Sequence, residues 1–280
     1  MTMKPNKPFE LLIDADTMLY QSALASEEEI EWDNDIWTLT ADLKTAKDLF
    51  NSQLTDLIHL SGCSLYTLCF TGSKNFRKDV SSSYKLNRKG KRKPVGYKQL
   101  REWAMDEGLT NEAKGRAILW DNLEADDVVG ILASEPNPKN PRVIYSVDKD
   151  LENVAGVHFK IDKKDDFVHP LFLTITPKES YKNFLKQCLM GDQTDGYIGV
   201  RGYGEVKSNR LIEQNPNWRT VLNTYISAGM TEDDAVQTAR LAHILHWDDY
   251  NISEGKIRLW QPTENQTTNM KDIVSGCTET

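Results

Sequence analysis

The sequence predicts an α/β fold in which a mainly parallel central sheet is flanked by helices. Short apolar segments typical of buried strands recur along the chain, and segments with helical periodicity separate them. Several of the apolar segments end directly on an acidic residue. In parallel sheets the carboxyl ends of the strands share one edge, where ligands bind, so acids far apart in sequence can meet there.

Length and composition are those of a globular protein. The 280 residues suit one large domain or two, and 39 % are hydrophobic and 27 % charged. No apolar run approaches the ~20 residues that a membrane span needs, and the first residues lack the apolar core of a signal peptide. The four cysteines have no metal-type spacing. We therefore expect a cytoplasmic protein with reduced thiols and no membrane partner.

Predicted strands and helices follow one another along the chain. Apolar runs predict strands over residues 9–14, 64–70, 116–120, 142–147 and 171–176. Helical periodicity predicts helices after Asp16 and over residues 41–60, 96–107, 205–214 and 231–247. A further helix is predicted over Pro177–Met190, because Thr176 and Glu179 form a capping box before it. Residues 26–35 are interpreted as an acidic loop, residues 163–166 as a polar loop and residues 252–260 as a small hairpin.

The segment Glu124-Ala-Asp-Asp127 begins another helix and is the centre of the predicted site. Ala125, Val128, Val129 and Leu132 share one helix face, so the acids lie directly above a core-facing stripe. Acids in a first turn also interact favourably with the helix dipole, which is the purely structural interpretation.

Acidic pairs recur at other predicted element ends, and together they predict a site for divalent metal. The candidates are Asp14, Glu124, Asp126, Asp127, Asp148, Asp150, Asp192 and Asp195. Hard cations prefer oxygen ligands, and so many acids at close range need cations to stay ionised. Two Mg²⁺ ions roughly 3.5–4 Å apart would clamp a phosphate during in-line displacement. Taken singly, Asp148 can instead start a turn, and Asp192 and Asp195 can cap a helix end.

A strongly basic tract covers residues 74–101. It contains eleven Lys and Arg residues and one acid, Asp79, so the rest of the chain carries a net charge of −18. A solubilising loop is one interpretation. A tract so one-sided in an otherwise acidic chain favours contact with the phosphates of a nucleic acid.

In this order the segments resemble those of the 5′ nucleases, or flap endonucleases, and specifically the phage-encoded 5′→3′ exonuclease branch. The matching motifs are Leu11–Asp14, Asn75–Lys78, Tyr84–Arg88, Lys93–Tyr97, Glu124–Asp127, Ser146–Asp150, Gly191–Gly196 and Gly199–Gly204. The resemblance implies a 5′-nuclease or PIN-like fold with a helical arch at about residues 74–101. We expect an α/β nuclease core over residues 1–178, a helical region with a helix–two-turn–helix motif over 179–262, and a polar tail over 263–280.

The resemblance also implies roles for residues. The eight acids would surround two Mg²⁺ ions, for which Mn²⁺ can substitute. Catalysis would depend on Asp14, Asp126 and Asp148, with Lys85 and Arg88 as cations near the scissile phosphate. The glycine turn would hold duplex phosphates through its amides, with a bound K⁺. The implied DNA contacts are Arg77, Tyr84, Lys85, Arg88, Arg92, Gly202, Gly204 and Lys207.

The implied activity is Mg²⁺-dependent hydrolysis of DNA from 5′ ends, at duplex ends, nicks or flaps, by a monomer in a phage-infected host cell. RNA in RNA–DNA hybrids is a further implied substrate. One departure from the family pattern concerns Gly72, where many relatives carry an aspartate after the second strand. It leaves the first metal site one carboxylate short unless water or Asp16 takes that place, and we expect Asp16 to be a helix cap.

Two other interpretations remain open from the residues. Asp14-Ala-Asp16-Thr17 after an apolar strand resembles the D-x-D-x-T motif of haloacid-dehalogenase-type phosphatases, with Asp14 as nucleophile and Asp16 as general acid. That interpretation leaves the acidic helix, the basic tract and the glycine turn unexplained. A non-catalytic DNA-binding relative that lost a metal site is suggested by Gly72, although the eight remaining acids argue against it.

Overall fold

A six-stranded sheet forms the centre of the protein. The computed structural model describes residues 4–263 apart from positions 7, 34, 109–112 and 165–166. The strand order is β5-β4-β1-β6-β7-β8, and only the β7–β8 pair is antiparallel. The strands are β1 (Glu10–Asp14), β4 (Leu65–Phe70), β5 (Lys114–Leu119), β6 (Arg142–Tyr145), β7 (Gly156–Lys164) and β8 (Phe167–Ile175). The predicted α/β fold with a mainly parallel sheet is confirmed.

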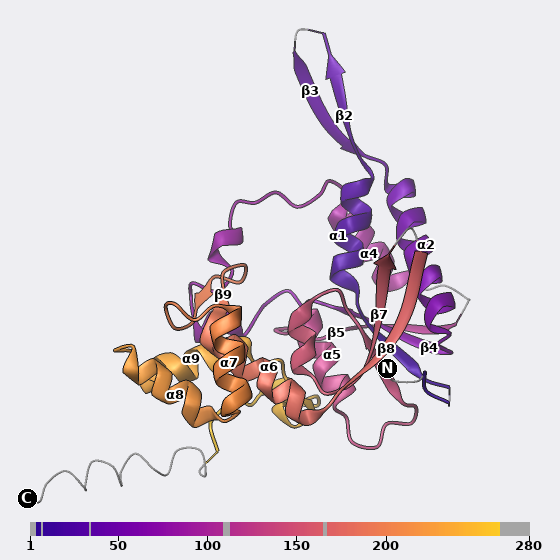
Figure 1. Cartoon of the computed structure of the whole chain (residues 1–280). Helices are drawn as coiled ribbons and strands as arrows, with labels where there is room; N and C mark the ends of the chain where they lie inside the picture. The colour runs from indigo at the N-terminus through magenta and orange to yellow at the C-terminus, as the bar shows by residue number, and fades with distance from the viewer. Residues whose placement is uncertain (1–3, 7, 34, 109–112, 165–166, 264–280) are drawn as a thin grey trace, which may run out of the picture.

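Helices cover both faces of this sheet (Figure 1). Leu11 and Ile13 of β1 pack with α1 (Ala15–Ala25), α2 (Leu43–Ser61) and α4 (Tyr97–Asp106). Leu12 points the other way and packs with α5 (Ala125–Ala133). This alternation is what a strand buried on both faces requires.

A second core lies in the C-terminal helices. The helices are α6 (Pro177–Met190), α7 (Glu205–Gln214), α8 (Trp218–Ser227) and α9 (Glu232–Ala242). They pack around the buried rings of Trp218 and Tyr225, and Tyr84 of the basic tract joins them. The basic tract therefore connects this core to the sheet. None of the described helices is both long and apolar enough to cross a membrane.

Short elements complete the chain. The strand pairs are β9 (Gly191–Asp192) with β10 (Tyr197–Ile198) and β11 (Tyr250–Asn251) with β12 (Lys256–Ile257), the second of which confirms the predicted hairpin. Single turns of 3₁₀ helix are η1 (Leu86–Arg88), η2 (Lys149–Asn153) and η3 (Trp247–Asp249), and α3 (Arg77–Val80) is one α turn. The predicted helix over residues 231–247 ends at Ala242. Beyond it, the His243 carbonyl oxygen accepts from Arg77 and the Leu245 amide donates to Asp127, so these groups are not used in a helix.

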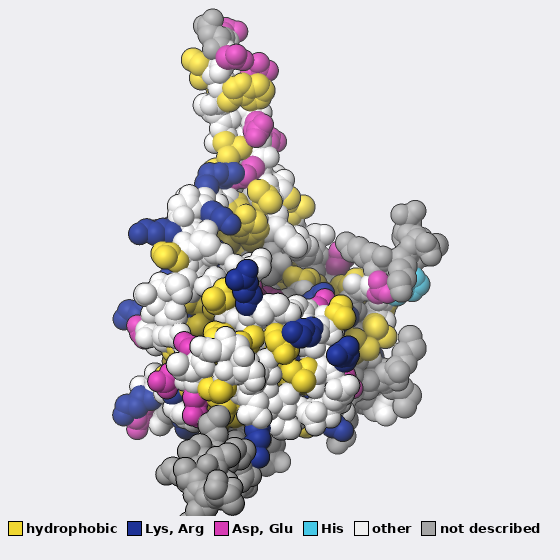
Figure 2. Space-filling model, turned by 60° about the vertical axis from the view of Figure 1, so that its left-hand side comes forward, with side chains coloured by type: hydrophobic (Ala, Val, Ile, Leu, Met, Phe, Trp, Pro, Cys, Tyr) yellow, Lys and Arg dark blue, Asp and Glu magenta, His cyan; other side chains and the backbone are white. Residues whose placement is uncertain are grey.

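The expectation of an acidic loop over residues 26–35 was wrong. Strands β2 (Glu27–Trp32) and β3 (Ile36–Ala41) pair antiparallel and project from the body of the protein (Figure 1). Hydrophobic and acidic side chains are mixed along this hairpin (Figure 2). Its apolar residues Trp32, Ile36 and Trp37 are exposed. The segment therefore lacks the sequence pattern of a strand that packs against a core.

The expected helical arch also differs. Residues 89–96 cross from η1 to α4 as an extended segment (Figure 1) and contain no helix. Gly90 and Gly96 have φ of 83° and 77°, and Pro94 lacks an amide hydrogen, so this stretch cannot continue a right-handed helix.

Candidate active site

The carboxyl ends of neighbouring strands bring the predicted acids together. Asp14 ends β1 and caps α1, with its Oδ1 accepting from the Asp16 amide at 3.2 Å. Its Oδ2 lies 3.4 Å from the hydroxyl of Ser146, which follows β6. The same hydroxyl accepts from the Asp148 amide at 3.0 Å, and Asp148 in turn caps η2 by accepting from the Asp150 amide. The ends of β1 and β6 are thus linked through Ser146.

Three acids at the start of α5 form one group, the α5 group, with Glu124, Asp126 and Asp127 as members. Their ligand atoms lie within 4.8 Å of one another. Glu124 and Asp127 bond reciprocally as a capping box. Burial and the two neighbouring carboxylates raise the pKa of Asp126 well above its usual range.

Arg77 is buried against this group, with only 1 % of its surface exposed. It donates to both oxygens of Asp127, at 2.6 and 2.9 Å, and to Glu124 at 3.3 Å. It also donates to the carbonyl oxygens of Leu241 and His243 at 2.9 and 2.7 Å. The prediction that Arg77 contacts DNA is therefore wrong, because its guanidinium is enclosed by protein acceptors.

Asp127 is held firmly by these contacts. Besides Arg77, its oxygens accept from the amides of Glu124 and Leu245, each at 3.2 Å. Both oxygens are therefore engaged by protein donors. The Asp126 side chain accepts one hydrogen bond, from the Asp127 amide at 2.8 Å, and is the member of the α5 group best placed to bind a cation.

Asp150, Asp192 and Asp195 form a second group, the turn group. Their ligand atoms also lie within 4.8 Å of one another. Asp150 comes from η2, Asp192 ends β9, and Asp195 lies in the turn between β9 and β10. Oδ1 of Asp192 accepts from the amides of Thr194 and Asp195, at 2.6 and 3.0 Å, which fixes the turn.

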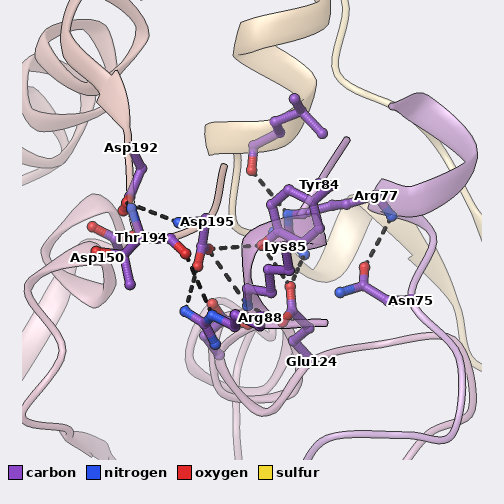
Figure 3. A network of polar contacts seen from close by, with 12 residues as sticks. Asn75, Arg77, Tyr84, Lys85, Arg88, Glu124, Asp150, Asp192, Thr194 and Asp195 are labelled. Carbon is purple, nitrogen blue, oxygen red and sulfur yellow. Dashed lines mark hydrogen bonds and ion pairs between the residues drawn. The ribbon is translucent and has the colours of Figure 1, made fainter. Parts of the chain in front are cut away.

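Lys85 lies between the two groups (Figure 3). Its ammonium pairs with Glu124 of the α5 group and lies 3.4 Å from Oδ2 of Asp195 in the turn group. The Tyr84 hydroxyl lies 2.8 Å from Glu124 and 2.9 Å from Asp195, and Arg88 pairs with Asp195 at 2.6 Å. Tyr84 is only 3 % exposed, so the prediction that it contacts DNA is wrong, since the hydroxyl joins the acid groups instead.

The acids differ in how their charge is compensated. Burial alone would raise the pKa of Glu124, but Arg77 and Lys85 lower it to about 2. Burial, with help from Asp148, raises the pKa of Asp150 to about 6. Burial, with help from Asp16, raises the pKa of Asp14 to about 7. No Lys or Arg among the described residues compensates the charge of the last two carboxyl groups.

The donor set fits divalent metal ions. Both groups offer only carboxylate oxygens, which are the ligands of hard cations such as Mg²⁺. A bound cation would also supply the positive charge that Asp14 and Asp150 lack. A third group, His243, His246 and Asp249, is an internal pairing, because one Asp249 oxygen already accepts from the His246 amide and contacts the His243 ring.

The predicted DNA contacts outside the acid groups lie on the surface. Gly204 caps α7 without any side-chain bond to the first amides, which leaves these amides open to a phosphate. Gly202, with φ of 84°, and Lys207 are exposed beside it. Arg92 pairs with Glu27 at the base of the projecting hairpin. Lys and Arg side chains stand on the face below that hairpin (Figure 2).

Gly72 has no room for a side chain. A Cβ at this position would lie 2.6 Å from the Trp120 carbonyl oxygen and 3.1 Å from the Asn122 amide. The expectation that Asp16 caps a helix was wrong, because Asp14 is the cap of α1 and Asp16 lies inside its first turn.

Comparison with known proteins places this arrangement in a family. The family model of the 5′-3′ exonuclease N-terminal resolvase-like domain matches residues 10–182. The chain belongs to the 5′-3′ exonuclease family. It is 28 % identical to the exonuclease of Escherichia phage T7, over 90 % of this chain and 93 % of that protein. It is 28 % identical to the exodeoxyribonuclease of Enterobacteria phage T3, over 90 % and 92 %.

A solved structure of the T5 D15 protein, co-crystallised with metal ions, shares the fold. The TM-score is 0.61 at 14 % identity, over 83 % of this chain and 88 % of that one. The 5′-3′ exonuclease fold therefore extends beyond the matched domain into the C-terminal helices.

Proposed function

We propose that this family member is a 5′→3′ exonuclease that hydrolyses DNA phosphodiester bonds from 5′ ends with two Mg²⁺ ions. The observation that carries the proposal is the convergence of two carboxylate groups on Lys85, which lies within the basic tract. The metal ligands would be Asp14, Glu124, Asp126, Asp148, Asp150, Asp192 and Asp195. Asp127 is kept in the proposal as a residue that orients Glu124.

Several observations support DNA and metal. The related T3 protein is named an exodeoxyribonuclease, and the T5 D15 structure holds metal ions. The segment over residues 74–101 carries a net charge of +10, which suits a polyanionic substrate. Bound Mg²⁺ would activate a water nucleophile and stabilise charge on the scissile phosphate, and Mn²⁺ would serve similarly.

The protein's own residues would position the substrate. Lys85 would contact the scissile phosphate, because it lies between the two acid groups, and Arg88 would assist beside Asp195. Tyr84 fixes the spacing of Glu124 and Asp195. The open amides at the start of α7, with Lys207, would hold phosphates of the duplex, and we include a K⁺ ion at the turn of residues 199–204 in the proposal.

Substitution of single acids tests the proposal. Asp148→Ala and Asp126→Ala should abolish release of nucleotides from 5′-end-labelled duplex DNA in Mg²⁺, while DNA binding in Ca²⁺ is retained. Asp56→Ala, which removes an exposed acid on α2, is the matched control and should cleave normally. Retained Mg²⁺-dependent cleavage by Asp148→Ala would contradict the metal assignment.

Substrate choice separates the remaining alternatives. Nicked, flap and RNA–DNA hybrid substrates, compared in one product analysis, would show which ends are attacked. A phosphatase of the haloacid-dehalogenase type would instead hydrolyse a small phosphomonoester, and family membership gives that alternative no support. A non-catalytic relative would bind DNA and cleave none of these substrates.

A further inference from the structure

Asp16 lies at the same sheet edge as the proposed metal ligands but is not one of them. Its Oδ2 accepts from the Thr71 amide at 3.3 Å. The Thr71 hydroxyl accepts from the Ala125 amide at 3.0 Å, and Ala125 lies between Glu124 and Asp126. Two hydrogen bonds therefore connect Asp16 to the start of the α5 group.

The other oxygen of Asp16 is buried and has no partner. Among the side chains that the structure describes, Oδ1 of Asp16 is the one carboxylate oxygen that is buried without a hydrogen bond. An unsatisfied buried carboxylate oxygen is costly. Such an atom in a native protein indicates that a binding partner is missing. Because Asp14 is adjacent, that partner must be favourable beside two acidic side chains.

The nearby cations of the protein do not fill this position. Arg101 donates to the carbonyl oxygen of Thr71, and the ammonium of Lys93 lies over the Tyr97 ring at 4.7 Å. Within the described ranges, no ion pair joins Asp16 to Lys or Arg. A small external cation is the partner that suits the geometry.

Strand register explains why this acid is needed here. Asp14 of β1 is paired with Cys69 of β4, so Thr71 and Gly72 leave the sheet beside Asp16. Position 72 cannot supply an acid, because a Cβ there would collide with the Trp120 carbonyl. Asp16 lies at the same edge but belongs to α1, the helix that follows β1.

We propose that Asp16 holds a divalent cation together with Asp14, on the β1–β4 side of the site, in place of an acid at position 72. This inference rests on the proposed metal-dependent function and adds one ligand to it.

Manganese titration of Asp16→Asn tests the inference without relying on turnover. Free Mn²⁺ is counted by electron paramagnetic resonance as it is added to the purified full chain. The wild type should bind two ions, and the variant should bind one of them about tenfold or more weakly. Asp16→Glu, which restores the charge, should recover part of that affinity. Asp56→Asn, an exposed acid on α2, should match the wild type.

Unfolding temperature in EDTA separates a metal ligand from a counter-ion. If Asp16 is a metal ligand, its Oδ1 is unsatisfied when no metal is bound. Asp16→Asn should then leave the unfolding temperature in EDTA unchanged or raise it. Unchanged Mn²⁺ affinity would overturn the inference. So would a lower unfolding temperature in EDTA with intact Mn²⁺ binding, since Asp16 would then be a counter-ion of Arg101. If the wild type itself binds no Mn²⁺ or cleaves no DNA, the proposed function fails as well.

Discussion

The α5 group and the turn group are built from the same side chains but keep their charge in different ways. In the α5 group, the buried Arg77 and the bridging Lys85 lower the pKa of Glu124 to about 2. In the turn group, burial raises the pKa of Asp150 to about 6. The protein thus supplies its own cations to Glu124, and in the turn group to Asp195 through Lys85 and Arg88. Asp150 has no ion pair with Lys or Arg among the described residues, so a bound cation would favour its charged form.

This difference has a structural cause. The α5 group lies at a helix start that packs against the core, where an uncompensated charge would destabilise the fold. The turn group joins η2 to the β9–β10 turn, and its three members are partly exposed, so an acid there can hold a proton at little cost. We infer that the α5 group sets the geometry and that the turn group responds to metal.

Of the substitutions that distinguish the two groups, removal of Arg77 should have the largest effect on stability. Arg77→Met should destabilise the protein by about 3–5 kcal/mol, because it leaves Asp127 and Glu124 as buried acids without their cation. Urea unfolding in EDTA at pH 7 measures this loss. Arg88→Ala removes a half-exposed arginine that contacts the turn group, and it should shift stability by less than about 1 kcal/mol. Equal losses in the two variants would refute the distinction.

Removal of Lys85 tests the bridge between the groups. Lys85→Ala should lower the single-turnover rate about 10²–10³-fold at saturating Mg²⁺, because a positioned cation acts mainly on charge that develops in the transition state. Lys89→Ala, an exposed position in the same tract, should change the rate little. A normal rate in Lys85→Ala would remove this lysine from the mechanism.

Acidity should weaken metal binding through Asp14 and Asp150. Burial raises their pKa values in the folded protein to about 7 and about 6, above the ordinary aspartate value of 3.8. The metal-free folded state therefore binds more protons than the unfolded state, and its stability should fall as pH rises from about 4 to 7. Metal displaces these protons, so Mg²⁺ affinity should rise up to about tenfold per pH unit over that range.

Calorimetry in buffers of different ionisation enthalpy counts the protons released on Mg²⁺ binding. Asp150→Asn should release fewer protons near pH 6 than the wild type. Proton release that is unchanged in this variant would mean that Asp150 is already ionised in the metal-free protein.

The smallest effects are expected on the basic tract, away from both groups. Lys91→Ala and Lys93→Ala should each reduce the slope of log affinity for duplex DNA against log salt by about 1. Fluorescence anisotropy at several salt concentrations measures the slope. Lys178→Ala, which removes an exposed lysine in the first turn of α6, serves as control. An equal effect in this variant would show that the salt dependence reflects the overall charge of the protein and not the basic tract.

The sheet and the acids were predictable because both signals are local. Five of the six strands contain a short apolar run, and Asp14 and Glu124 lie at or just beyond the ends of two of them, so parallel strands alone bring them to one edge. Strand β7, with the sequence Gly-Val-His-Phe-Lys-Ile-Asp-Lys-Lys, has no such run and was not predicted. The hairpin β2–β3 was missed because its apolar residues are exposed and interleaved with acids. The helical arch was expected from resemblance, and two glycines and Pro94 exclude it at residues 89–96.

The function of Arg77 could not be predicted from the sequence. It stands among surface-like basic residues, and its acceptors Leu241 and His243 lie 164 and 166 positions away. Asp16 shows the same difficulty, since only the Thr71 contact and the unpaired oxygen distinguish it from an ordinary helix residue. Pairings of this kind depend on tertiary packing, which periodicity does not report.

The long reach of Arg77 also sets an order of events during synthesis. The acids of the α5 group leave the ribosome more than a hundred residues before the carbonyl groups of Leu241 and His243. Until that late stretch emerges, Arg77 lacks two of its acceptors and Asp127 lacks the Leu245 amide. A nascent chain therefore carries its acids without the contacts that align them, and the finished site cannot form until Leu245 has emerged.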